Sequence, residues 1–297
     1  MRFGLFGTGP WAQMAHAPAL AAHPDVELLG VWGRNPDKAA ALAGEHGATA
    51  YTGVDALLAD VDAVAVALPP DVQADVALQA ARAGRHLLLD KPIALTTAAA
   101  GQIVAEVGAR GLSSAVFFTR RYVPEIEEFL RSTAAVAGWQ EARVDHLGSI
   151  FEPENPFGAS PWRRERGGLW DLGPHALSLV LPVLGPVVAV TAMGGPRATT
   201  HVLLRHDGGA VSTLTLSVDS APAAARDEAV FHGEPGSATV PTVELDHVRA
   251  FGRAVDQLLA AAAGGEQPAC DVRFGAEVVA VLAAADTAAR DGRTVTL

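Results

Sequence analysis

The stretch RFGLFGTGPWA, residues 2–12, joins a short apolar run to a glycine-rich turn and to the start of a helical pattern. A strand, a tight turn and a helix in this order direct backbone N–H groups and the positive end of the helix dipole toward one point. Glycine suits such a turn because it adopts backbone angles that other residues avoid and leaves room for a bound phosphate. The predicted anion-binding turn consists of Gly7, Thr8, Gly9, Pro10 and Trp11.

Apolar runs alternate with amphipathic segments through the first 119 residues. The predicted buried strands are residues 2–6, 26–32, 63–68 and 86–89. The predicted helices between them are residues 11–22, 36–45, 70–83 and 96–109. This alternation is typical of a parallel sheet with helices on both faces. We therefore predict a doubly wound, Rossmann-type α/β domain over residues 1–119, in which the glycine turn binds a dinucleotide.

The pattern changes after residue 119 to longer segments that alternate between apolar and polar residues. In residues 211–218, Leu214 and Leu216 alternate with Thr213 and Thr215, as expected for an antiparallel sheet with one buried face. The preceding Asp-Gly-Gly at residues 207–209 predicts a hairpin turn. Two helices are predicted near the end, at about residues 245–263 and 273–290. Residues 120–297 are therefore predicted to form an α+β domain with a large open, mainly antiparallel sheet.

Length and composition are those of a folded protein with two domains. The chain has 297 residues, whereas a single domain usually has about 100–200. Hydrophobic residues make up 49% and charged residues 19%, far from the composition of disordered chains. The formal net charge of −11 argues against nucleic acid as a partner, since nucleic-acid-binding surfaces concentrate Lys and Arg.

Cysteine, histidine and the N-terminal residues bear on metal binding and location. Cys270 is the single cysteine, and the histidines lack a ligand-like spacing, so we predict no disulfide and no metal site. The N-terminus lacks the apolar segment of about 7–15 residues that a signal peptide needs, so we expect the protein in the cytoplasm. Residues 176–193 are uncharged, but Pro182, Gly185 and Pro186 interrupt them. We predict a helix, a turn and a strand there instead of a membrane span.

The residues after the second predicted strand indicate which dinucleotide binds. An acidic residue for the ribose diol is expected about 20 residues after the glycine turn. Here the sequence has Gly33, Arg34 and Asn35 instead. A guanidinium can hold a 2′-phosphate with paired, charge-assisted hydrogen bonds, so NADP is favoured and NAD stays possible. The alternative is that Arg34 stacks on the adenine or points into water.

Three short motifs mark candidate site residues. Two lie at the edge of the predicted α/β sheet where ligands bind, and the third lies in the second predicted domain. They are LPP at residues 68–70, LDKP at residues 89–92 and GGLWDLGPH at residues 167–175. The first two follow predicted strands, at the edge of the sheet where a cofactor would lie. At these residues the sequence resembles the Gfo/Idh/MocA oxidoreductases, the family of glucose–fructose oxidoreductase and inositol dehydrogenase. The resemblance covers essentially the whole chain.

The resemblance implies a set of site residues. The family's catalytic residues correspond to Lys91, Asp171 and His175, and Leu68, Pro69 and Asp90 join Lys91 beside the cofactor. The sequence also departs from the family pattern. Asp90 replaces the usual Glu, Leu68 a frequent Thr, and Gln73 stands where many members have His. The first change keeps the charge, and the other two affect contacts at the cofactor edge.

The expected chemistry requires a group that handles a proton while hydride moves to or from nicotinamide. His175 suits this because an unperturbed imidazole titrates near pH 6.5. Pro174 is the expected first helical residue, and Asp171 is positioned to orient the His175 ring. Lys91 would donate to the reacting oxygen, and the sequence leaves open whether Lys91 or His175 is the final proton acceptor. Taken singly, Lys91 could be a surface lysine, His175 a helix-start histidine and Asp171 a helix cap.

Residues around the third motif suggest how a substrate binds. The face of Trp162 suits a sugar ring, whereas Trp170 fits core packing better. Arg163, with Arg164 and Arg166, could meet a carboxylate or phosphate or form salt bridges within its loop. The leading hypothesis is an oxidoreductase acting on a sugar, cyclitol or related polyhydroxy compound. Alternatives are a reductase of small ketones or dihydrodiols, and a dinucleotide-binding sensor without turnover. By analogy with the family, a homo-dimer or tetramer is expected.

Overall fold

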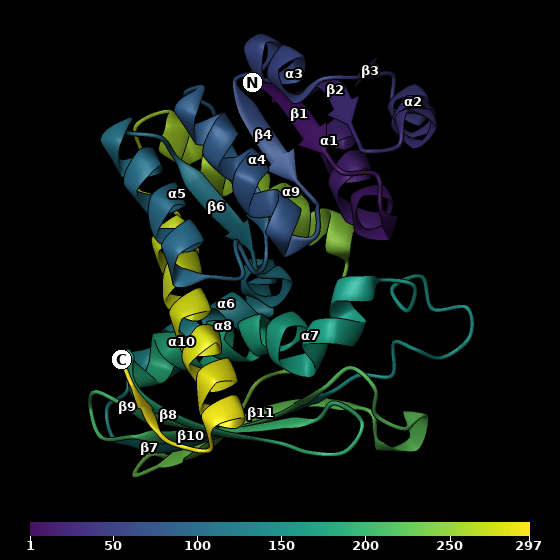
Figure 1. Ribbon diagram of the computed structural model, residues 1–297. Helices are drawn as coiled ribbons and strands as arrows, with labels where there is room; N and C mark the ends of the chain where they lie inside the picture. Colours follow the sequence, from purple (N-terminus) through teal and green to yellow (C-terminus); the bar gives the residue numbers. More distant parts are fainter. The chain divides into compact units, whose positions relative to one another are not determined.

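The computed structural model describes residues 1–297 as two compact units (Figure 1). The first unit contains Met1–Tyr122 and Leu245–Ala276, and the second contains Val123–Glu244 and Glu277–Leu297. The sequence prediction drew one division, between residues 119 and 120. In the structure the first boundary follows Tyr122, close to the predicted point, but the later segment Leu245–Ala276 also belongs to the first unit.

The first unit contains a six-stranded parallel sheet in the order β3-β2-β1-β4-β5-β6. The strands are β1 (Arg2–Phe6), β2 (Glu27–Trp32), β3 (Thr49–Tyr51), β4 (Ala63–Val66), β5 (His86–Asp90) and β6 (Ser114–Phe117). The four predicted strands are present, and the chain reverses its direction of winding at β1. The Rossmann-type prediction is confirmed. β3 was not predicted because it is three residues long and mostly exposed, without an apolar run.

Three helices of the first unit, those that begin at residues 36, 97 and 247, are preceded by a side chain that accepts a hydrogen bond from a free backbone N–H group. The helices of this unit are η1 (Ala12–His16), α1 (Ala17–Ala22), α2 (Pro36–Glu45), α3 (Val54–Asp60), α4 (Pro70–Arg82), α5 (Thr97–Ala109), η2 (Thr119–Tyr122) and α9 (His247–Ala262). Thr96 caps α5 by accepting a hydrogen bond from the N–H of Ala99 at 3.2 Å. The predicted helix at residues 11–22 has a π-helical first turn, η1, directly after the glycine turn. α4 and α9 lie on opposite faces of the sheet (Figure 1).

The late helix α9 belongs to the first unit because its apolar stripe is buried there. Phe251 on α9 packs edge-to-face on Phe117 of β6, with ring centres 4.9 Å apart. The edge of β6 is also covered, since the N–H of Val116 donates to the carbonyl of Cys270 at 2.6 Å. The segment Leu245–Ala276 thus covers the last strand of the sheet, which would otherwise present unpaired backbone groups. Periodicity predicted this helix but not the unit on which it packs.

His16 is buried in this contact without a hydrogen-bond partner on either ring nitrogen. It stacks on Phe251 at 4.1 Å between ring centres. Burial in these apolar surroundings lowers the pKa of His16 from 6.5 to about 3. At neutral pH the side chain is therefore an uncharged part of the core.

His16 should make the first unit sensitive to acid. Between pH 6.5 and about 3, His16 is protonated in the unfolded chain and neutral in the folded chain. As the pH falls through this range, the free energy of unfolding therefore decreases by up to about 1.4 kcal/mol per pH unit. We expect the unfolding midpoint of His16→Phe to rise above that of the wild type by a gap that widens from pH 7 to pH 4. A control variant, His46→Gln, should show no widening gap. A constant His16→Phe gap would contradict this account.

The second unit contains a seven-stranded sheet in the order β12-β11-β7-β10-β9-β8-β13. The strands are β7 (Trp139–Leu147), β8 (Val187–Gly194), β9 (Thr200–His206), β10 (Val211–Ser217), β11 (Arg226–Gly233), β12 (Gly236–Thr239) and β13 (Val295–Thr296). Only β7 and β10 pair in parallel, so the prediction of a mainly antiparallel sheet is confirmed. The predicted hairpin joins β9 to β10, and Gly209 in its turn has φ of +90°.

Helices of the second unit lie on one side of this sheet (Figure 1). They are α6 (Pro124–Ala134), α7 (Pro161–Asp171), α8 (Gly173–Leu184) and most of α10 (Val272–Asp291), with the short η3 (Pro222–Ala224) in a loop. Along β7, Ala142 and Val144 are buried while Arg143 is exposed, which matches a sheet with one covered face. The uncharged segment at residues 176–193 forms the end of α8, a turn at Gly185 and β8, as predicted. No helix is both long enough and apolar enough to span a membrane.

Candidate active site

The predicted anion-binding turn lies where the winding of the first sheet reverses, between β1 and its neighbours β2 and β4. Gly7 follows β1 with φ of +133°, and a Cβ there would overlap the carbonyl oxygen of Ala67. Its N–H donates to the carbonyl of Trp32 at 2.8 Å, which ties the turn to the end of β2. A Cβ on Gly9, in contrast, would meet no atom within 4 Å. Gly7 shapes the turn, and Gly9 leaves its backbone open to a pyrophosphate.

Gly7 and Gly9 should therefore respond differently to alanine. We expect Gly7→Ala to destabilise the cofactor-free protein by about 1–3 kcal/mol, because it adds backbone strain and a clash. Gly9→Ala should leave the thermal unfolding of the cofactor-free protein unchanged but weaken dinucleotide binding about tenfold or more, because its methyl group enters the open space. Thermal unfolding and fluorescence titration with NADH and NADPH measure the two effects. Unchanged dinucleotide affinity in Gly9→Ala would contradict this assignment.

The end of β2 packs directly against the glycine turn. A Cβ on Gly33 would lie 2.6 Å from Cγ2 of Thr8, so only glycine permits this approach. Arg34 follows and is exposed. Asn35 has a structural role because its side chain accepts a hydrogen bond from the N–H of Lys38 at 3.1 Å and caps α2. Trp11, also predicted at the cofactor, packs on His247 of α9 with ring centres 4.8 Å apart.

Lys91 is held at the end of β5 by a buried glutamine that the sequence analysis treated only as a departure from the family pattern. The Gln73 side chain donates to the carbonyls of Asp90 at 2.7 Å and Pro92 at 3.0 Å. It also accepts from the N–H of Asp90 at 3.1 Å. The Asp90 carboxylate accepts from the N–H of Lys91 at 2.7 Å. The backbone on both sides of Lys91 is therefore fixed. Pro69, after β4, is the N-cap residue that precedes α4, the helix that carries Gln73.

In the second unit, three glycines seat the GGLWDLGPH segment on its sheet. Gly167 has φ of +61° and kinks α7. A Cβ on Gly168 would lie 2.6 Å from the backbone nitrogen of Ser217 at the end of β10. A Cβ on Gly173 would lie 2.6 Å from Cδ2 of Leu282 on α10. The glycines of the motif thus permit a close approach that brings the start of α8 onto the covered face of the sheet.

Asp171, at the end of α7, is buried and paired with an arginine of the same helix. Nε of Arg163 donates to Oδ2 of Asp171 at 2.8 Å. The Arg163 guanidinium also lies over the rings of Trp162 at 4.7 Å and Phe157 at 5.2 Å. An arginine partner with a good hydrogen bond offsets the cost of burying a carboxylate. Of the two roles that the sequence leaves open for Arg163, substrate contact or salt bridging, the structure shows the salt bridge.

His175 lies in the first turn of α8, after Pro174, as the sequence predicts. Its carbonyl accepts from the hydroxyl of Ser178 at 2.7 Å. Its ring is partly exposed and lies beside the ring of His146 on β7, with ring centres 5.9 Å apart. His146 was not predicted as a site residue, because one histidine in a strand carries no spacing signal. Trp170 is 2% exposed, in agreement with the core role that the sequence favours.

The predicted residues thus form two groups. Gly7, Gly9, Gly33 and Lys91 lie in the first unit, with the other predicted cofactor residues. The second group, in the second unit, consists of Trp162, Arg163, Asp171 and His175.

Models of one family match both parts of the chain. The model described as oxidoreductase family, NAD-binding Rossmann fold matches residues 1–118, and the family's C-terminal domain model matches residues 142–239. The chain belongs to the Gfo/Idh/MocA family. Members of this oxidoreductase family combine the two domains that the sequence predicted, and the recognition made from its motifs is confirmed.

Several Gfo/Idh/MocA relatives have named activities. A dTDP-3,4-didehydro-2,6-dideoxy-alpha-D-glucose 3-reductase from Streptomyces antibioticus is 31% identical, with 74% of this chain and 70% of the relative covered. A UDP-N-acetylglucosamine 3-dehydrogenase from Acidithiobacillus ferrooxidans is 34% identical, with 73% and 67% covered. Among solved structures, GenD2 from gentamicin A biosynthesis, in complex with NAD, superposes with a TM-score of 0.87 at 26% identity over 100% of this chain and 96% of GenD2.

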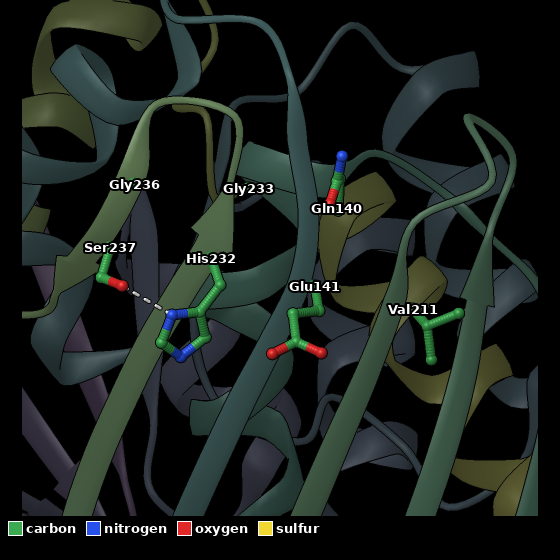
Figure 2. A pocket seen from close by; sticks show the side chains of 7 residues that line it. All are labelled: Gln140, Glu141, Val211, His232, Gly233, Gly236 and Ser237. Carbon is green, nitrogen blue, oxygen red and sulfur yellow. Dashed lines mark hydrogen bonds between the residues drawn. The ribbon is translucent and has the colours of Figure 1, made fainter.

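A hollow at the edge of the second sheet lies outside both groups of predicted residues. Figure 2 shows a hydrogen bond between His232 of β11 and Ser237 of β12, with Nδ1 and Oγ 2.7 Å apart. Glu141 of β7 lies beside them in the lining of the hollow. Glu141 forms its ion pair with Arg143, at 3.0 Å. We interpret the His232–Ser237 contact as a cross-strand pair that stabilises the β11–β12 hairpin.

Proposed function

We propose that this protein is an NADP-preferring oxidoreductase that interconverts a secondary alcohol and a ketone on a sugar, cyclitol or related polyhydroxy compound. The observation that carries the proposal is the fixation of Lys91. Gln73 and Asp90 make four hydrogen bonds that hold the backbone from Asp90 to Pro92, and one of these bonds is to the N–H of Lys91. A lysine with only a surface role would not need a buried glutamine to position it.

The chemistry divides between the two groups of residues. Bound dinucleotide supplies the redox capacity, which is uptake or return of hydride at the nicotinamide ring. Lys91 donates a hydrogen bond to the reacting oxygen and stabilises its alkoxide character. His175 takes the hydroxyl proton during oxidation and returns it during reduction. Asp171, paired with Arg163, is the carboxylate that this set contributes from the second unit.

The preference for NADP rests on the residues after β2. The three residues directly after this strand, Gly33, Arg34 and Asn35, include no acid, and the exposed Arg34 follows the Thr8–Gly33 contact with the glycine turn. A carboxylate there would repel a 2′-phosphate, whereas a guanidinium attracts it. GenD2 binds NAD, and the family description also names NAD. The argument for NADP in this protein therefore depends on Arg34 alone.

The substrate class rests on the relatives and on the aromatic residues of α7. The named relatives act on dTDP- and UDP-linked sugars. Trp162 is partly exposed one residue before Arg163, and its ring suits the apolar face of a pyranose or cyclitol. Such substrates offer a secondary alcohol for Lys91 and His175 and further hydroxyl groups for the remaining polar residues.

We also propose that the second sheet assembles the protein into a homodimer or tetramer. Met193 on β8 and Leu203 on β9 are large apolar side chains, 72% and 48% exposed. Burial of these side chains against a second copy would remove apolar surface from water. Light scattering at micromolar concentration would show a dimer or tetramer, and a monomer would contradict this part of the proposal.

A spectrophotometric screen at 340 nm tests the proposed activity. Free and nucleotide-linked sugars, cyclitols and small ketones are incubated with NADP⁺, NAD⁺ and their reduced forms. We expect turnover on a polyhydroxy compound with higher kcat/KM for the phosphorylated dinucleotide. Turnover only on small ketones or dihydrodiols would favour the alternative reductase. Tight NADPH binding without turnover on any compound would favour a dinucleotide-binding sensor.

A further inference from the structure

Three titratable side chains on three elements of the second unit form a row that the sequence analysis did not identify. Asp227 on β11 lies opposite His146 on β7 in the strand register. Oδ2 of Asp227 is 3.9 Å from Nε2 of His146. The ring of His146 is next to that of His175 on α8, with centres 5.9 Å apart and planes at 50°. The row is Asp227, His146 and His175.

The fold places His146 on the helix-covered face of the sheet. Its side chain follows the buried Ala142 and Val144 at every second position of β7, and only 17% of it is exposed. On β10, the residue in register with His146 is Leu216, which is fully buried. The close approach at Gly168 then brings the start of α8, and with it His175, toward this point. Strand alternation and the glycine contacts therefore determine the juxtaposition.

The known neighbours of His146 come from three elements. Asp227 comes from β11 and His175 from α8, while β10 contributes the apolar Leu216. On α7, the carboxylate of Asp171 is paired with Arg163. The acid that the sequence assigned to orient His175 therefore already has an arginine partner. His146 is a polar side chain that lies beside the His175 ring.

We infer that His146 is a positioning residue for His175, and that Asp227 orients His146. In this arrangement His146 holds the His175 ring in the orientation and tautomer that proton transfer needs, by a hydrogen bond or through one shared water. Carboxylates and imidazoles that hold a proton-transferring histidine act in this way in other enzymes. The role rests on the proposed function, because it concerns the group that moves the proton.

The structure offers close controls for each member of the row. Asp145 is next to His146 on β7 but points to the other face, where its Oδ2 is 3.8 Å from Nη1 of Arg226. Its side chain is 42% exposed, against 40% for Asp227. His201 on β9 is an exposed histidine of the same sheet. Asp145→Asn and His201→Gln thus remove similar groups without touching His175.

The first measurement is ¹⁵N NMR of histidine-labelled, cofactor-free protein, in which the His175→Gln variant identifies the His175 ring signals. We expect His146→Gln and Asp227→Asn to change the two ring-nitrogen shifts of His175, and the two control variants to leave them in place. Unchanged His175 shifts in both His146→Gln and Asp227→Asn would overturn the inference. This readout needs no substrate, so it holds even if the proposed function fails.

The second measurement is a double-mutant cycle on turnover. His146→Gln should lower kcat about tenfold or more and leave KM and dinucleotide affinity nearly unchanged, because the substrate still binds. Adding His146→Gln to His175→Gln should cause little further loss, because His146 acts through His175. If the loss in kcat of the double variant were instead the product of the two single losses, the inference would be overturned and His146 would have an independent role. Absence of turnover in the wild type would instead count against the proposed function, and the NMR result would still decide the role of His146.

Discussion

Replacement of Lys91 with alanine should lower kcat by about 10²–10⁴-fold, the contribution usual for a positioned proton donor or acceptor. The backbone at this position is fixed by Gln73 and Asp90, so removal of the amine should leave the surrounding chain in place. His175→Ala should cause a loss of the same order, because the reacting hydroxyl would have no imidazole to exchange its proton. Steady-state kinetics on the substrate found in the screen measures both losses.

Lys38 provides a matched control for Lys91, because it is the only other lysine in the sequence and lies exposed on α2. Lys38→Ala should keep nearly full turnover. Thermal unfolding of Lys91→Ala should match the wild type, which separates lost chemistry from lost structure. If Lys91→Ala and His175→Ala both turned over at nearly the wild-type rate, the catalytic assignment would be wrong.

Arg34→Ala should weaken the binding of NADPH by about 10–100-fold, the effect of losing a hydrogen-bonded charge pair of about 1.5–3 kcal/mol. Binding of NADH should change little, because NADH has no 2′-phosphate for the guanidinium to hold. Fluorescence titration of each reduced dinucleotide measures the two affinities, and kcat/KM ratios provide a second readout. The dependence of NADPH affinity on salt should also become weaker.

Lys38→Ala again serves as control, since it removes a nearby positive charge on α2 without removing the guanidinium. It should leave the ratio of NADPH to NADH affinity almost unchanged. If Arg34→Ala weakened both dinucleotides equally, Arg34 would stack on the adenine or act by general charge. The NADP preference would be wrong if the wild type bound NADH more tightly than NADPH and Arg34→Ala left the ratio of the two affinities unchanged.

The helices and strands of the first unit were predictable because each has a local cause. Apolar runs at β1, β4 and β5 are buried on both faces, as parallel strands require. The predicted helix boundaries of α2 and α5 agree with the structure to within a residue, since proline or a capping side chain marks their beginnings. β3 and α3 lack such signals because they are short and partly polar.

The candidate site was predictable in its residue types but not in its connections. The family motifs indicated Lys91, Asp171 and His175, yet they did not show that Gln73 fixes Lys91 or that Arg163 holds Asp171. These contacts join residues on different segments or turns, and a single sequence contains no record of which side chains meet. Asn35 shows the converse, because a residue assigned to the cofactor caps a helix.

The sequence by itself determined the class of each unit, the glycine turn after β1 and the histidine at the start of α8. These depend on backbone preferences and hydrophobic periodicity, which act over a few residues. Only the tertiary structure decided that α9 packs on β6, and that Asp227, His146 and His175 lie in one row. Such contacts depend on strand register and on the close approaches that Gly168 and Gly173 permit. They arise from packing of the whole unit, so no local pattern could have revealed them.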